Sequence, residues 1–106
     1  MVVVIKTPEI DRRAVEAFQC ELANAVGAYR VDASPDVPLT LDLRHVAFMD
    51  STGIRCLIDA DRAVTAVGGR MELLVEGIPR RLLEVTGLLE RFEPVPDVFD
   101  LREAAS

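Results

Sequence analysis

This sequence of 106 residues is poor in several residue types. It has no tryptophan, one tyrosine and a single lysine, Lys6, so its other basic residues are arginines. Acidic residues outnumber basic ones by 18 to 12, and the formal net charge is −6. Proteins bind nucleic-acid backbones through basic surfaces, often with aromatic rings that stack on the bases. The composition therefore argues against a nucleic-acid partner.

Long hydrophobic runs are absent as well. The longest run covers residues 1–5. That is far below the roughly 20 residues of a membrane-spanning helix and too short for the core of a signal peptide. We therefore expect a cytoplasmic protein with no membrane-inserted segment.

Cysteine and histidine are scarce. Cys20 and Cys56 lie far apart and form no CxxC pair, so the sequence predicts neither a zinc site nor a disulfide framework. We interpret both as inert reduced thiols, with a redox role near Ser51 as the alternative. His45 is the only histidine, which excludes a cluster of histidine metal ligands. We expect no metal and no cofactor.

The length and the hydrophobic content indicate one folded unit. Half of the residues are hydrophobic, which is enough for a continuous core in a chain of this size. No linker, repeat or low-complexity segment divides the chain. We therefore expect a single domain over residues 1–106.

Hydrophobic spacing predicts alternating strands and helices. Apolar residues that are β-branched or alternate with polar ones indicate strands, and spacings of three and four indicate helices. The predicted strands cover residues 2–5, 39–43, 71–75 and, weakly, 92–95. The predicted helices begin at Asp11, Ser51 and Pro79 and end near residues 27–29, 68 and 87, and a last helix covers residues 97–105.

This order of elements predicts an α/β fold with a mostly parallel sheet of about four strands, because parallel neighbours need long right-handed crossovers. Helices are expected mainly on one face of the sheet. The strict alternation within residues 39–43 and 71–75 supports this expectation, since a sheet covered on both faces has continuous apolar strands. Each of these strands should then have one dry and one wet face.

Residues 39–53, LTLDLRHVAFMDSTG, carry the strongest functional signal. An alternating strand is followed by a short apolar loop at 46–49 and by Asp-Ser-Thr-Gly at a predicted helix start. The first turn of a helix has free N–H groups and a partial positive charge, so it stabilises an oxygen anion. Ser51 or Thr52 can supply that oxygen as a cap, and Ser51 can equally receive a phosphoryl group. Taken alone, Asp50-Ser51-Thr52 is interpreted as an ordinary N-cap.

The wider pattern resembles the signature of the STAS domain, and most closely that of the bacterial anti-sigma factor antagonists. These proteins have an apolar strand, a loop ending in Phe-Met-Asp or similar, Ser-Ser/Thr-Gly, and then a helix. The resemblance extends over nearly the whole chain. Residues 8–11 look like the family's Gly-Glu-Leu-Asp, residues 68–69 like its helix stop, and residues 86–88 like its Ser-Gly-Leu.

The resemblance implies a partner switch. In this family the serine after the aspartate is phosphorylated by the cognate anti-sigma factor, a serine kinase, and Ser51 is the matching acceptor. The unmodified protein captures that kinase and frees a sigma factor, whereas the phosphorylated form does not bind. The family is not enzymatic. The partner surface implied here comprises Glu9, Asp11, Asp50, Thr52, Gly53, Ile54 and Arg55.

The chain departs from the family pattern in three places. The chain begins at a strand that matches the family's second, so we expect the usual first strand to be missing and an edge to be exposed at residues 2–5, with a misassigned start as the alternative. Self-association through that edge is a hypothesis. Pro8 stands where the family has glycine. Arg55 replaces a second glycine, and it lies one helical turn beyond Ser51. It can pair there with a phosphate, or it can bridge to Asp59.

Two other functions fit parts of the sequence. An enzyme would use Ser51 as nucleophile and His45 as base, although the chain has no Gly-x-Ser-x-Gly elbow. STAS modules also serve as adaptor subunits of membrane transport or stress-signalling assemblies. A test of ester hydrolysis distinguishes the first alternative, and identification of the bound partner distinguishes the second.

Overall fold

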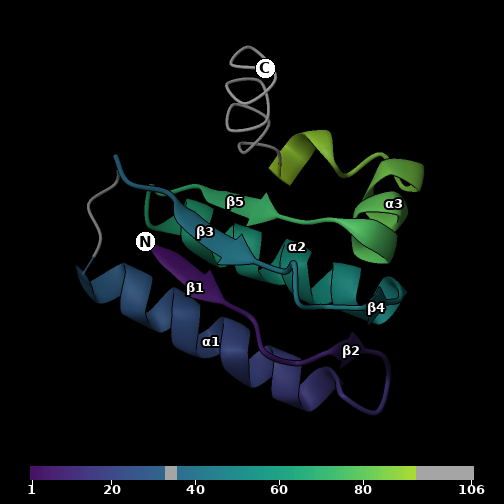
Figure 1. The fold of residues 1–106 in the computed structure, drawn as a ribbon. Coiled ribbons are helices and arrows are strands. Elements are labelled where there is room, and N and C mark those ends of the chain that lie inside the picture. Colours follow the sequence, from purple (N-terminus) through teal and green to yellow (C-terminus); the bar gives the residue numbers. More distant parts are fainter. Residues whose placement is uncertain (33–35, 93–106) are drawn as a thin grey trace, which may run out of the picture.

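The computed structural model describes residues 1–32 and 36–92 of the chain, in which strands and helices alternate (Figure 1). The strands are β1 (Val2–Val4), β2 (Glu9–Ile10), β3 (Leu39–Asp42), β4 (Phe48–Met49) and β5 (Met71–Leu74). The helices are α1 (Val15–Asp32), α2 (Ser51–Ala66), α3 (Gly77–Val85) and the 3₁₀ helix η1 (Glu90–Phe92). None of the described helices is both long and apolar enough to cross a membrane.

Two small parallel sheets form the strand layer. β1, β3 and β5 lie side by side in that order, and Val3, Leu41 and Leu73 are in register across them. The short strands β2 and β4 pair with each other beyond the carboxyl ends of β1 and β3 (Figure 1). The predicted parallel α/β fold is confirmed. The loop predicted at residues 46–49 is wrong, because Phe48 and Met49 form a strand.

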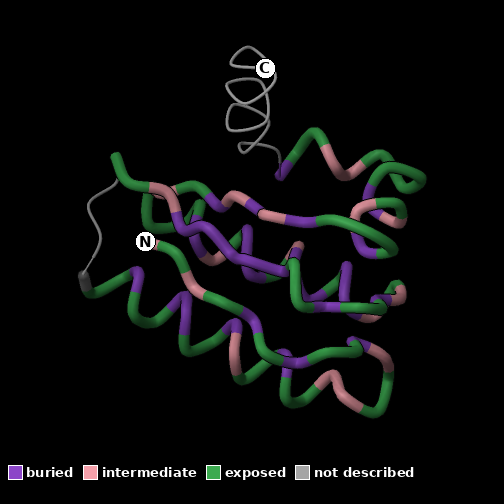
Figure 2. The backbone as a smooth tube through the Cα atoms, viewed as in Figure 1, coloured by how far each residue is buried: buried purple, intermediate pink, exposed green. Residues whose placement is uncertain are grey.

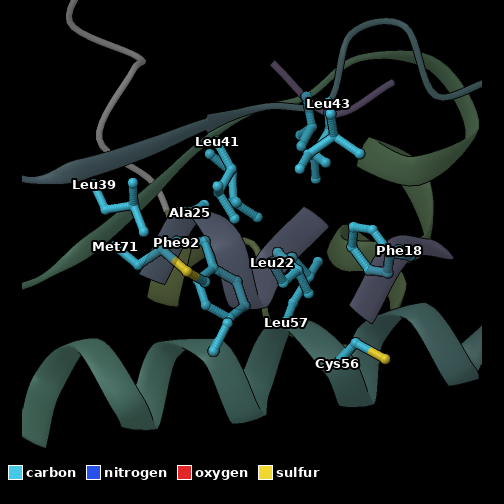
Figure 3. Packing of buried hydrophobic residues seen from close by; sticks show 14 of the residues in the cluster. Phe18, Leu22, Ala25, Leu39, Leu41, Leu43, Cys56, Leu57, Met71 and Phe92 are labelled. Carbon is cyan, nitrogen blue, oxygen red and sulfur yellow. The ribbon is translucent and has the colours of Figure 1, made fainter. Parts of the chain in front are cut away.

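Helices α1 and α2 cover one face of the larger sheet, as predicted. The inward-facing residues of β3 meet Phe18 and Leu22 of α1 and Leu57 of α2 in a continuous apolar core (Figure 3). In Figure 2 the buried stretches accordingly follow β3 and the sides of α1 and α2 that face it. Helix α3 lies beside β4 at the carboxyl end of the sheet (Figure 1).

The face of the sheet that points away from α1 and α2 is more buried at its centre than predicted. Val2 and Val4 of β1 are exposed there, but Thr40 and Asp42 of β3 are buried. The wet face predicted for residues 39–43 is therefore wrong, because β3 is the central strand and its neighbours on both sides shield its short polar side chains. Arg44 forms hydrogen bonds with the buried carboxylate of Asp42. Its Nε donates to Oδ1 of Asp42 and its Nη2 to Oδ2, both at 3.0 Å.

Acid is expected to weaken this part of the sheet. The hydrogen bonds from Arg44 lower the pKa of Asp42 and outweigh its burial, which raises it. A carboxylate whose pKa is lowered by folding stabilises the fold above its unfolded pKa of about 3.9, and that stabilisation is lost as the pH falls through the folded pKa. We predict that Arg44→Gln lowers the free energy of unfolding by about 2 kcal/mol at pH 7.

Urea unfolding of wild type and Arg44→Gln at pH 7 and pH 3 checks this prediction. The difference between the two proteins should shrink at pH 3, because without Arg44 the burial of Asp42 raises its pKa, and the carboxyl of the variant then becomes protonated and no longer needs the guanidinium. Arg70→Gln is the control, since its ion pair with Glu72 is longer, 3.5 Å, and Arg70 is largely exposed. A difference that stays the same at both pH values would contradict the assignment.

Several element ends differ from the prediction. α1 begins at Val15, after a turn in which Asp11 accepts hydrogen bonds from the N–H groups of Arg13 and Ala14. α3 begins two residues before Pro79, which still lies in the first turn, where a missing N–H costs nothing. Phe92, predicted in a strand, ends a 3₁₀ helix instead. The rest of that strand and the predicted last helix lie outside the described residues.

Candidate functional site

The pairing of β2 with β4 joins two segments that are far apart in the sequence. Glu9 is in register with Phe48, and Ile10 with Met49. The N–H of Asp50 then donates to the carbonyl oxygen of Ile10 over 3.1 Å. The residues before α1 and the start of α2 therefore form one continuous surface region at the carboxyl end of the strand layer.

Asp50 is the N-cap of α2. Its backbone is extended and its side chain accepts a hydrogen bond of 2.9 Å from the N–H of Thr52. The ordinary N-cap predicted within Asp50-Ser51-Thr52 is confirmed, but the capping oxygen belongs to Asp50 and not to Ser51 or Thr52. Because the aspartate satisfies the helix end, the hydroxyl of Ser51 has no capping role. Ser51 is the first helical residue and is exposed to solvent.

Gly53 allows α2 to approach β2 and β4 closely. A Cβ atom at this position would collide with the Met49 side chain and would lie 2.8 Å from Cγ2 of Ile10. Gly53 and its neighbour Ile54 are both buried. These two residues of the predicted partner surface therefore pack beneath the first turn of α2 and contribute no side chain to the accessible surface.

The other predicted residues reach the surface to different extents. Glu9, Ser51 and Arg55 are exposed, whereas Asp50 and Thr52 are half-buried. Asp11, also half-buried, has its Oδ1 engaged by the turn before α1. The accessible surface at the α2 entrance thus combines carboxylates, the hydroxyls of Ser51 and Thr52, and the Arg55 guanidinium.

Phe48 is a member of this surface that the sequence analysis missed. Its residue is 42% exposed, while the next residue, Met49, is buried. Exposed aromatic side chains are enriched among the residues that contribute most to protein–protein binding. Residues 46–49 are all apolar, and buried and exposed residues do not alternate over them, so the sequence has no signal that singles out Phe48.

Arg55 remains open toward solvent. Within the part of the chain that the structure describes, the ion pairs are Arg44–Asp42, Arg70–Glu72, Arg80–Glu84 and Arg91–Asp61. The alternative of a bridge from Arg55 to Asp59 is therefore not realised. Residues four apart on a helix are neighbours, so the guanidinium has Ser51 within its range.

The serine-enzyme alternative finds no assembled catalytic pair. His45 is exposed in the turn between β3 and β4, and no hydrogen bond connects it to Ser51 among residues 1–32 and 36–92. Cys20 is exposed, and Cys56 is buried, where desolvation raises the pKa of its thiol. A raised pKa keeps this thiol protonated and unreactive at neutral pH.

Comparison with known protein families gives one match that spans nearly the whole chain. The model of the STAS domain matches residues 1–104. This domain is the fold of anti-sigma factor antagonists. The matched region contains both sheets, the three α-helices and every residue of the surface described above.

Proposed function

Because this chain belongs to the STAS domain family, we propose that it is an anti-sigma factor antagonist controlled by phosphorylation of Ser51. The observation that carries the proposal is the exposed hydroxyl of Ser51 at the first position of α2, released from capping by Asp50. A kinase can reach this hydroxyl without unfolding the helix. The proposed partner is an anti-sigma factor that is also a serine kinase.

In the unmodified state, the anti-sigma factor binds the surface around the α2 entrance. Phe48 supplies an apolar contact, and Glu9 beside it supplies a charge that fixes orientation. Binding removes the anti-sigma factor from its sigma factor. In this role the protein is an adaptor with no catalytic activity of its own, and it works in the bacterial cytoplasm, where sigma factors act.

Phosphorylation changes the charge of this surface at its centre. A phosphoserine carries about −1.5 to −2 charges at neutral pH and three strongly hydrated oxygens. On this chain the positive end of the α2 dipole and the Arg55 guanidinium stabilise it. When the partner is bound, the phosphate would be desolvated beside Asp50, which adds like-charge repulsion. The modified protein therefore releases the anti-sigma factor.

Phosphate mapping tests this proposal directly. The protein is incubated with ATP and each ATP-binding anti-sigma candidate from its own genome, and phosphopeptides are identified by mass spectrometry. We expect phosphate on Ser51 and none on Ser51→Ala. Thr65→Ala is the matched control, because Thr65 is an exposed hydroxyl residue near the far end of the same helix. Phosphate elsewhere, or none with any kinase, would refute the proposal and favour a constitutive STAS adaptor.

Arg55 is expected to matter more to this reaction than another arginine of the same helix. Arg55 and Arg62 are both exposed on α2, but only Arg55 lies one turn from Ser51. We predict that Arg55→Ala changes the phosphorylation rate or the partner affinity by about fivefold, corresponding to one charge-assisted contact. Arg62→Ala should change either quantity less than about twofold. Equal effects in kinetic and binding assays would show that Arg55 is an ordinary surface residue.

A further inference from the structure

The outer edge of β1 has main-chain groups that face away from the sheet. The carbonyl of Met1 accepts from the N–H of Thr40 over 2.8 Å, and the N–H of Ile5 donates to the carbonyl of Asp42 over 3.0 Å. In a strand, the N–H and C=O groups of alternate residues point to opposite sides. Because Met1 and Ile5 face β3, the groups of Val2 and Val4 face outward.

A side chain from α1 marks where this edge ends. The N–H of Lys6 points outward like those of Val2 and Val4, and it donates to both carboxylate oxygens of Glu21 at 3.1 Å. No hydrogen bond to the outward groups of Val2 or Val4 occurs among the described residues. The available edge is therefore the β1 strand itself, without charge, proline or bulge to block it.

We propose that β1 pairs antiparallel with β1 of a second copy of this chain, so that one continuous sheet runs through both copies. The pairing is self-complementary about a two-fold axis at Val3. Val2 then lies opposite Val4 of the second copy, and each such pair exchanges both of its outward N–H and C=O groups. Every other register that brings outward groups together forms fewer of these bonds or runs into Glu21.

The surroundings of the edge can accept this second strand. Asn24 and Ala28 are three and seven residues from Glu21 on α1, and so lie on the same side of that helix. Both side chains are short, and the Val3 side chain of the second copy points toward this helix layer, as Val3 itself packs against the core. No charged side chains of β1 oppose each other in this register, so the pairing itself brings no like-charge repulsion.

Disulfide trapping tests the register. Val3 faces Val3 across the axis in a non-hydrogen-bonded pair, where Cα atoms are about 4.5 Å apart, which lies within the range found for disulfides. In a Cys20→Ser background, Val3→Cys should cross-link at least tenfold faster than Val2→Cys. Random collision predicts the reverse order, because Val2 is the more exposed residue. Faster cross-linking of Val2→Cys would overturn the proposal.

Sedimentation equilibrium tests the association itself. Val4→Pro removes one outward N–H and leaves the bonds between β1 and β3 in place, so it should weaken dimerisation at least tenfold. Val4→Thr keeps the N–H and should dimerise within threefold of wild type, and thermal unfolding confirms that both variants fold. A wild-type protein that stays monomeric at millimolar concentration would refute the dimer. Ser51→Ala leaves this association unchanged, so the result is independent of the proposed phosphorylation.

Discussion

Replacing Ser51 by glutamate is expected to weaken binding of the cognate anti-sigma factor by about 100-fold, which corresponds to about 2.7 kcal/mol. The new carboxylate would lie beside Asp50 in a contact surface that the unmodified protein presents as a neutral hydroxyl. Its burial there adds desolvation and like-charge repulsion. Isothermal titration calorimetry with the purified kinase measures the loss.

Ser51→Ala is the matched control for this substitution. Asp50 makes the capping hydrogen bond to the N–H of Thr52, so removal of the Ser51 hydroxyl leaves the helix end satisfied. We expect Ser51→Ala to bind within about threefold of wild type and to unfold at the same urea concentration. Equal binding by Ser51→Glu and Ser51→Ala would contradict a charge-controlled switch at this position.

Gly53→Ala is expected to destabilise the protein by about 1–3 kcal/mol, as for other insertions of a methyl group into a packed site. The added Cβ collides with the Met49 side chain and with Ile10, so α2 must move away from β2 and β4. The flexible Met49 side chain relieves part of the clash, which keeps the expected loss within that range. Urea unfolding monitored by circular dichroism measures it.

Gly27→Ala is the internal comparison, because it makes the same substitution in the other long helix. Gly27 lies within α1, and a Cβ there meets no atom within 4 Å. Alanine favours the helix over glycine by about 0.8–1 kcal/mol, so this variant should be more stable than wild type. If both variants gain stability, the close approach at Gly53 is refuted as a constraint on the site.

The pattern of the sequence was sufficient for the long elements. The spacing of apolar residues places α1, α2, β3 and β5 within a few residues of their observed positions, because apolar residues repeat along each of them with the period of a helix or a strand. Two-residue strands such as β2 and β4 carry no such period. Their hydrogen bonds form only after α1 and β3 have brought residues 9–10 and 48–49 together, so local sequence cannot reveal them.

At the candidate site, too, some features could be predicted from the sequence and others depend on tertiary contacts. The sequence by itself determined that a serine stands at the start of a helix, since Asp-Ser-Thr-Gly after an apolar strand is a local signal. Only the tertiary structure decided that Gly53 and Ile54 face inward and that Phe48 faces outward. These outcomes depend on how α2 rests against β2 and β4, and the contacts involved join residues distant along the chain.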